Sequence, residues 1–370
     1  MKVDLDIISP SLWLPNYKKT IIVAGPCGAE TEEQVMQTAI ELSKNNQVQI
    51  FRSGIWKPRT RPNSFEGVGT VGLKWLQQVK KETGLLTTTE VATAEHVEQA
   101  LKHNIDILWI GARTTVNPFT VQEIADALKG TDIPVMVKNP VNPDLNLWIG
   151  ALERFNQAGI KKLIAIHRGF STLAKGVYRN APMWSIPIEL KLLIPNLPII
   201  CDPSHIAGKR NLLLDVIQKS VDLNMDGFIV EVHNNPDAAL SDAKQQVTPN
   251  NFAEILSRII YKTEDSDNVI FDHQIQELRN IIDRVDVDLI EAIAKRMEIV
   301  DKIGEHKKEN NVTILQMERW FEVLNTRTGK GESLGLDKTF LTRLFDLVHE
   351  ESIRRQQEIM SNANKEQSID

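Results

Sequence analysis

The chain has 370 residues, 42% of them hydrophobic and 25% charged, which excludes a disordered or fibrous protein and fits a large domain with or without a small one. Its formal net charge of -6 argues against a general nucleic-acid or membrane-surface role. Only two cysteines, Cys27 and Cys201, are present, so a disulfide framework is excluded. No apolar run reaches the roughly 18 residues of a membrane span, and no signal segment opens the chain, so we expect a cytoplasmic protein.

Eight short apolar runs alternate with amphipathic segments of helical period between residues 20 and 233. We expect strands at 20–27, 49–54, 84–91, 107–112, 134–138, 163–168, 197–202 and 227–233. Alternating strands and helices imply a parallel sheet, and eight repeats in roughly 240 residues favour a (β/α)8 TIM barrel over an open doubly wound sheet. The predicted fold class is therefore α/β for this part of the chain.

Polar side chains stand at the end of each of these runs or in the loop just after it. They are Cys27, Arg52, Lys57, Arg59, Glu90, Arg113, Lys138, His167, Arg168, His205 and Glu231. The strand ends of a TIM barrel gather at one face, where such enzymes keep their chemistry. Any one of these residues could be an ordinary capping or solvated group, but the whole succession predicts an active site.

Two kinds of group are expected at this face. One is a mixed sulfur, nitrogen and oxygen ligand set, Cys27, His205, Glu231 and Asp242, which suits Mn, Fe, Co or Zn better than Mg or Ca. The other is a cluster of cations, Arg52, Lys57, Arg59, Arg113, Lys138 and Arg168, which predicts anionic substrates that carry phosphates or carboxylates. A buried carboxylate such as Glu231 also needs a cation or strong donors beside it.

A glycine-rich stretch, Gly67-Val-Gly-Thr-Val-Gly72, matches the GxGxxG dinucleotide fingerprint. The residues before it form a proline-broken loop instead of the strand that the fingerprint requires. We therefore expect no nucleotide cofactor.

A set of short motifs in this region resembles the 3-deoxy-D-arabino-heptulosonate 7-phosphate (DAHP) synthases, of the short bacterial type close to the 3-deoxy-octulosonate synthases. The motifs are Ala24-Gly-Pro-Cys27, Lys57-Pro-Arg-Thr60, Gly111-Ala-Arg-Thr114, Val137-Lys-Asn139, Ile166-His-Arg-Gly169, Asp202-Pro-Ser-His205 and the segment 231–242. The resemblance implies condensation of phosphoenolpyruvate with erythrose 4-phosphate, the first step of the shikimate pathway. The sister synthases usually carry a Lys-Ala-Asn-Arg-like stretch at residues 57–60, so arabinose 5-phosphate is the less favoured alternative.

The same resemblance implies roles for the residues at the strand ends. Phosphoenolpyruvate would be bound by Arg52, Lys57, Arg113, Lys138 and Arg168, and the phosphate of erythrose 4-phosphate by Arg59 and Thr60. A divalent ion on Cys27, His205, Glu231 and Asp242 would act as a Lewis acid on the aldehyde. Lys57 and Glu90 are the catalytic candidates, and Glu90 is either a proton-transfer or water-positioning group or a salt-bridge partner of the lysines.

After Tyr261 the chain changes character, and a polar segment at 263–269 is expected to link the barrel of residues 1–262 to a helical domain of residues 270–370. Apolar residues then recur every three or four positions without proline, which predicts one helix of more than about 30 residues. Two shorter helices are expected at about 314–326 and 337–360, with a turn at 329–331. Because so long a helix cannot bury its apolar stripe within one small domain, we expect a homodimer of intertwined helices.

The spacing of polar residues in this tail resembles the all-helical chorismate mutase family, with three helices, over about residues 270–360. The matching positions are Arg279, Arg296, Lys307, Arg319, Glu351, Ser352 and Gln356. The rearrangement of chorismate to prephenate needs cations and hydrogen-bond donors, not a nucleophile.

By similarity, Arg296, Arg319 and the Arg279 of a partner chain would bind carboxylates, while Lys307 and Gln356 would donate to the ether oxygen and Ser352 would assist binding. Gln316 and Trp320 depart from the family, some of whose members carry acids near the substrate hydroxyl. An alternative interpretation makes the tail a dimerising allosteric sensor with little turnover, and feedback on the barrel by prephenate or chorismate is a hypothesis.

Overall fold

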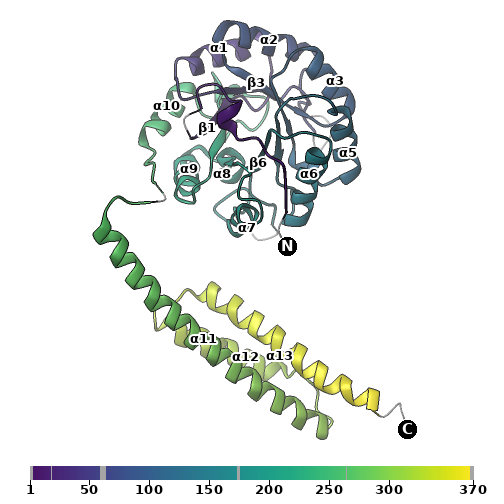
Figure 1. Cartoon of the computed structure of the whole chain (residues 1–370), viewed down its shortest axis with the longest axis vertical. Helices are drawn as coiled ribbons and strands as arrows, with labels where there is room; N and C mark the ends of the chain where they lie inside the picture. Colours follow the sequence, from purple (N-terminus) through teal and green to yellow (C-terminus); the bar gives the residue numbers. More distant parts are fainter. Residues whose placement is uncertain (1–2, 18, 59–63, 173–175, 264, 367–370) are drawn as a thin grey trace. The chain divides into compact units, whose positions relative to one another are not determined.

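The computed structural model describes residues 3–17, 19–58, 64–172, 176–263 and 265–366, with the side chains described as far as residue 361. The chain forms two compact units, Met1–Glu264 and Asp265–Asp370 (Figure 1). Within the described ranges, no helix is both long and apolar enough to span a membrane.

The first unit is a closed barrel of parallel strands that pair in chain order, β1 through β8, with β8 returning to β1. The strands are β1 Ile21–Gly25, β2 Ile50–Arg52, β3 Leu86–Val91, β4 Ile107–Ile110, β5 Val135–Lys138, β6 Leu163–His167, β7 Ile199–Cys201 and β8 Gly227–Glu231. Each strand lies inside one of the predicted apolar runs. The prediction of a TIM barrel is therefore confirmed.

Helices surround the strands, as Figure 1 shows. They are α1 Glu32–Ser43, α2 Val71–Thr83, α3 Ala94–Lys102, α4 Ala112–Thr115, α5 Pro118–Ala127, α6 Leu145–Gln157, α7 Ser185–Leu193, α8 Pro203–Ala207, α9 Leu213–Asp222 and α10 Pro249–Arg258. Several begin at a side chain that caps free backbone amides: Thr31, Thr93 and Asp144 accept from the third residue after themselves. These caps fix where the loops after the strands end, and the loops carry the polar groups of the barrel.

The glycine-rich stretch 67–72 leads into the first turn of α2 and packs against the loop after β2. A Cβ atom on Gly67, which has φ +96°, would lie 2.2 Å from the carbonyl oxygen of Ile55. A Cβ atom on Gly72 would lie 2.5 Å from the Ile55 side chain. The glycines thus permit the start of α2 and the residues before it to approach Ile55 closely, and this packing accounts for the fingerprint-like spacing.

The second unit consists of three helices, α11 Val269–Glu309, α12 Met317–Glu332 and α13 Lys338–Glu366. The predicted long helix is confirmed, since α11 has 41 residues. The predicted turn at 329–331 is wrong, because α12 continues through it and the chain reverses near Gly335, which has φ +83°. The reason is packing: a Cβ atom on Gly331 would lie 2.3 Å from Leu341 of α13, so this glycine lets two helices approach and does not end one.

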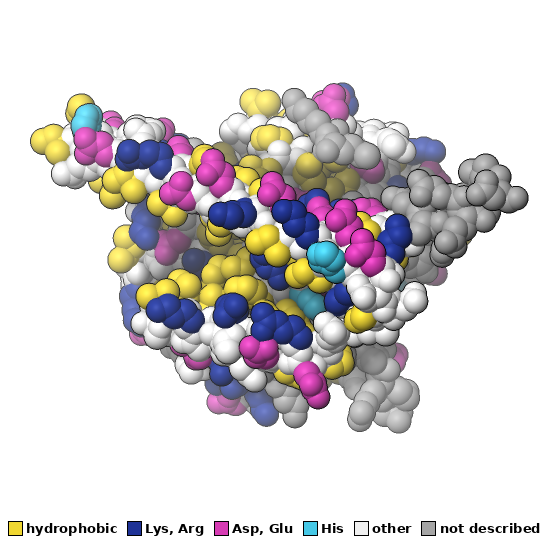
Figure 2. Space-filling model, turned by 90° about the horizontal axis from the view of Figure 1, so that it is seen from below, with side chains coloured by type: hydrophobic (Ala, Val, Ile, Leu, Met, Phe, Trp, Pro, Cys, Tyr) yellow, Lys and Arg dark blue, Asp and Glu magenta, His cyan; other side chains and the backbone are white. Residues whose placement is uncertain are grey.

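The two halves of α11 differ in how they are covered. Its buried residues are Met297, Val300 and Gly304, all in the second half, which packs against α13. The first half and the residue just after it carry apolar side chains that are exposed in the single chain: Leu278, Ile281, Ile282, Val285, Val287, Leu289 and Ile290. On the helical unit, apolar side chains lie exposed beside Lys and Arg side chains (Figure 2).

Candidate active sites

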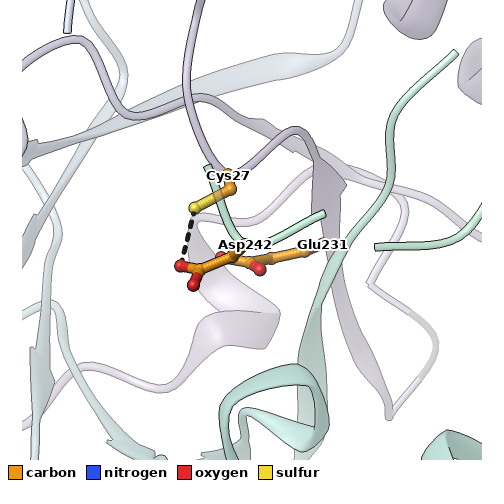
Figure 3. Close-up of side chains that lie close together, drawn as sticks. All are labelled: Cys27, Glu231 and Asp242. Carbon is orange, nitrogen blue, oxygen red and sulfur yellow. Dashed lines mark hydrogen bonds between the residues drawn. The ribbon is translucent and has the colours of Figure 1, made fainter. Parts of the chain in front are cut away.

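One thiol and two carboxylates meet at the carboxyl ends of β1 and β8. The ligand atoms of Cys27, Glu231 and Asp242 all lie within 4.8 Å of one another (Figure 3). The barrel register explains the meeting, because Gly25 pairs with Glu231 across the two strands and Cys27 follows two residues later. Cys27 Sγ donates to Asp242 Oδ2 at 3.3 Å. A thiol and two carboxylates at this spacing form a donor set that could hold a divalent metal ion.

His205, the fourth predicted ligand, reaches this cluster at one carboxylate. It lies in α8, directly after β7, and its Nε2 is 3.8 Å from Glu231 Oε1. Its Nδ1 is 2.9 Å from Asp202 Oδ1 on the other side of the ring. A carboxylate at one ring nitrogen is the usual arrangement that orients a ligand histidine, so Asp202 directs Nε2 toward the cluster.

Cations surround the three acidic groups. Lys57 Nζ is 2.7 Å from Cys27 Sγ, Arg52 donates to Glu231 at 3.3 Å, and Arg179 donates to Asp242 at 2.9 Å. Arg179 was not predicted from the sequence, because it lies well beyond the end of β6, where no strand-end pattern marks it.

The charges set the protonation of the cluster. Burial, followed by the charge of Glu231, raises the pKa of the Cys27 thiol to about 12. Burial also opposes ionisation of Asp242, but the charges of His205 and Arg179 outweigh it and hold the pKa of Asp242 below its usual range. The Cys27 thiol is therefore protonated in this structure, while the Asp242 carboxylate is ionised, so a divalent ion bound here would have to displace the thiol proton.

A tryptophan forms the floor below these groups. The guanidinium of Arg52 lies 4.9 Å from the ring centroid of Trp109, and Lys138 Nζ lies 6.0 Å from it. Lys138 also pairs with Asp202 at 2.8 Å. Glu90 accepts a hydrogen bond from Trp109 Nε1 at 3.2 Å, so its carboxylate helps to hold the floor in place.

Of the remaining cations of the predicted cluster, the structure describes Arg168 and Arg113. Arg168 donates to Asn180 at 3.1 Å. Burial lowers the pKa of Arg168 to about 10, and the charges of Arg179 and Arg113 add to that effect, so these arginines share one electropositive region. Arg59 and Thr60 lie outside the described residues.

His167, one of the strand-end residues, belongs to the aromatic packing around β6. Its ring centroid lies 5.1 Å from that of Trp184, 5.8 Å from Phe170 and 6.5 Å from Trp148. Burial lowers the pKa of His167 to about 3. It is therefore a neutral core residue of the fold.

In the helical unit, the structure brings together part of the predicted second site. Arg296 donates to Ser352 Oγ at 2.7 Å, and Gln356 Nε2 donates to the carbonyl of Ser352 at 3.1 Å. Gly304 allows this approach of α11 to α13, since a Cβ atom there would lie 3.2 Å from Gln356 Cγ. Lys307 donates to the carbonyl of Ile314 at 2.6 Å.

Two predicted arginines stand apart from this group in the single chain. Arg319 pairs with Glu322 of its own helix at 2.5 Å, and Arg279 lies in the first, exposed half of α11. Trp320 stacks on His349, with ring centroids 3.8 Å apart and 9° between the planes. Burial and then the charge of Arg296 lower the pKa of His349, so this histidine, absent from the sequence prediction, also faces the cationic group.

Two protein families match this chain, one over the barrel unit and one within the helical unit. Residues 15–267 match the DAHP synthetase I family, and residues 278–357 match chorismate mutase type II. Phospho-2-dehydro-3-deoxyheptonate aldolase of Thermotoga maritima is 32% identical over 238 residues, which cover 64% of this chain and 68% of that protein. 2-Dehydro-3-deoxyphosphooctonate aldolase of Geotalea daltonii is 27% identical over 259 residues, which cover 65% and 90%.

Two solved structures of DAHP synthases are also similar to this chain. The crystal structure of the Thermotoga maritima phospho-2-dehydro-3-deoxyheptonate aldolase (DAHP synthase) has a TM-score of 0.58 at 31% identity, and the match covers 65% of this chain and 68% of that chain. A truncated form of 3-deoxy-D-arabino-heptulosonate 7-phosphate synthase from the same organism has a TM-score of 0.56 at 29% identity and covers 64% and 84%.

Proposed function

The chain belongs to the DAHP synthetase I family, and from this premise we propose that its barrel condenses phosphoenolpyruvate with erythrose 4-phosphate to DAHP and phosphate, the first step of the shikimate pathway. The observation that carries the proposal is the meeting of a thiol and two carboxylates inside a ring of cations at the carboxyl ends of the strands. Such a site suits two phosphorylated substrates, because the acidic groups can bind a metal while the cations bind phosphate and carboxylate.

The residues that would hold the metal ion are Cys27, His205, Glu231 and Asp242. Their donor set fits Mn, Fe, Co or Zn, since a thiolate and an imidazole are poor ligands for Mg or Ca. The bound ion would supply Lewis acidity toward the aldehyde of the sugar phosphate. The thiol must lose its proton on binding, and Lys57 beside Cys27 favours that loss.

The cations hold the substrates for reaction. We assign Arg52, Lys57, Arg113, Lys138 and Arg168 to phosphoenolpyruvate, and Arg59 with Thr60 to the phosphate of the sugar. Arg52 and Lys138 both lie within 6.0 Å of the Trp109 ring centroid, so Trp109 places two of these cations near one another. Holding the enol carbon against the aldehyde carbon lowers the entropic part of the barrier. Glu90, fixed by Trp109, stands near as a group to move a proton or orient water.

Phosphate release tests this function. The purified chain should release inorganic phosphate only when phosphoenolpyruvate, erythrose 4-phosphate and Mn(II) are all present, and a chelator should stop the reaction. The Cys27→Ala chain should be inactive although folded. Equal activity of Cys27→Ala and the unchanged chain would contradict the role of the acidic cluster.

For the helical unit we propose the rearrangement of chorismate to prephenate. Two observations support this proposal: residues 278–357 match chorismate mutase type II, and Arg296, Ser352 and Gln356 form one hydrogen-bonded group. Lys307 and Gln356 would donate to the ether oxygen, and Arg296 with Arg319 and a partner's arginine would bind the carboxylates. A sensor with little turnover is the alternative. Chorismate consumption by the intact chain distinguishes the two.

The exposed apolar residues of α11 support a homodimer. A row of half-exposed side chains, Leu278, Ile282, Val285 and Leu289, recurs along one side of the helix. A second copy would cover this row and bring its own Arg279 to the site. We further propose domain limits at 1–262 and 270–370, a cytoplasmic location, and feedback by prephenate or chorismate on the barrel.

A further inference from the structure

Two adjacent glutamines in the loop after β8, Gln245 and Gln246, connect Cys27, Glu231 and Asp242, three of the four proposed metal ligands. Their exposed fractions are 1% and 0%, so neither is a solvated surface amide. Every one of their four side-chain polar atoms makes a hydrogen bond at this cluster. Neither was predicted from the sequence, since glutamine is not ionisable and neither residue lies at a strand end.

Gln245 fixes a carboxylate side chain. Its Nε2 donates to Glu231 Oε2 at 2.7 Å, and its Oε1 accepts from Arg179 at 2.7 Å. The amide group can lie only one way round, because its NH2 group faces an anion and its oxygen faces a cation. Arg179 also donates to Asp242, so one chain of hydrogen bonds joins two of the ligands.

Gln246 holds the backbone at two positions, Cys27 and Ser241. Its Oε1 accepts from the backbone N–H of Cys27 at 3.0 Å, and its Nε2 donates to the carbonyl of Ser241 at 2.8 Å. It therefore ties the loop after β1 to the residue just before Asp242. Asp242 has φ +50°, a backbone conformation that non-glycine residues adopt rarely, so the backbone there must be held by its surroundings.

We propose that Gln245 and Gln246 are positioning residues that hold Cys27, Glu231 and Asp242 at ligand spacing before the ion binds, an inference that rests on the proposed metal site of the synthase. Neither glutamine is a ligand. Partners of this kind set ligand orientation, and their loss weakens metal binding by roughly 10- to 100-fold in other metal sites.

The chain offers a matched control for the experiment. Gln49 is also buried, accepts from the backbone N–H of Ile22 at 2.7 Å and donates to the carbonyl of Thr20 at 3.0 Å. It makes the same pair of bonds as Gln246, but at the opposite end of β1. A change of Gln49 to methionine removes equivalent hydrogen bonds without touching the cluster.

Co(II) titration of the metal-free chain tests the proposal. The near-ultraviolet band of thiolate-bound Co(II) reports coordination by Cys27, and competition with a chelator gives the affinity. We expect Gln246→Met to bind Co(II) about 10-fold or more weakly, with a reduced band at saturation. Gln245→Met should also weaken binding but keep the band, because it acts on Glu231. Gln49→Met should match the unchanged chain.

The proposal would be overturned if Gln245→Met and Gln246→Met bound Co(II) with the affinity and band intensity of the unchanged chain. It would also be overturned if Gln49→Met lost as much Co(II) affinity as they do, since the effect would then be one of general stability. If Gln246→Met does not fold, Gln245→Met decides the matter by affinity alone. A missing thiolate band in the unchanged chain would instead reject the metal site itself, and with it this inference, which separates the two failures.

Discussion

Lys57 Nζ lies 2.7 Å from Cys27 Sγ, although the two residues belong to the loops after different strands. The same ammonium group donates to the backbone carbonyl of Cys27 at 2.7 Å. Lys57 thus joins the two halves of the site, the acidic cluster that can hold a metal and the cations that can hold phosphoenolpyruvate.

Replacing Lys57 by methionine should reduce phosphoenolpyruvate consumption by about 100-fold or more, because a cation fixed at a charged substrate is worth several kcal/mol in a partly buried site. Steady-state rates with erythrose 4-phosphate and Mn(II) measure this. Lys80, which pairs with Asp106 on the outer surface, is the matched control, and Lys80→Met should keep the normal rate. A Lys57→Met rate within a few-fold of normal would show that the ammonium group is not needed.

His167 should make the stability of the barrel depend on pH. Its pKa is about 3 in the fold, below the ordinary value of about 6.5, so between these values the unfolded chain binds a proton that the folded chain does not. The neutral His167 therefore contributes to the free energy of unfolding. This contribution is fully present above about pH 6.5 and is lost as the pH falls toward 3, so that about 2 kcal/mol of it is gone at pH 5.

His167→Phe should remove this pH dependence, since phenylalanine suits the surrounding aromatic rings. Urea unfolding followed by tryptophan fluorescence at pH 7 and pH 5 gives the free energy of unfolding for both chains, and the comparison cancels the other titrating groups. An identical change of stability between the two pH values in both chains would contradict a neutral, buried His167.

Mixing two inactive variants tests whether Arg279 acts in the partner's site. Arg279→Ala and Arg296→Ala chains should each lack chorismate mutase activity. Subunit exchange would give mixed dimers in which one of two sites has both arginines, so activity should return to about a quarter of normal. If both arginines served a site within one chain, every site would keep one defect and mixing would restore nothing.

Prephenate should lower the synthase rate of the intact chain if the helical unit regulates the barrel. A titration of phosphoenolpyruvate consumption with prephenate measures the effect, and Arg296→Ala, which cannot hold the ligand's carboxylate, is the control that should lose it. By linkage, any factor by which prephenate weakens the binding of the barrel's substrates is also the factor by which those substrates weaken the binding of prephenate. A synthase rate indifferent to saturating prephenate would leave two enzymes joined by a linker.

The strands, and the meeting of Cys27 with Glu231 at their ends, were predictable because β-runs and strand ends leave a local pattern. The same holds for the length of α11, which follows from a sustained helical period. The glycines of α12 misled the prediction, since whether a glycine ends a helix or admits a neighbour depends on a contact with Leu341 that is distant in sequence.

The supporting residues of the site were not predictable in this way. Arg179, Gln245 and Gln246 lie in irregular loops, and their partners become visible only when those loops are placed over β1 and β8. His349 was missed for a similar reason, because its stacking on Trp320 joins two helices. Residues that act through other residues leave little trace in a single sequence.

Competition between two sugars tests the central assignment most directly. The purified chain with phosphoenolpyruvate and Mn(II) would receive equal amounts of erythrose 4-phosphate and arabinose 5-phosphate, and mass spectrometry would identify the product. We predict the seven-carbon sugar acid phosphate, with arabinose 5-phosphate left unconsumed. An eight-carbon product would assign the barrel to the sister reaction and contradict the proposed function.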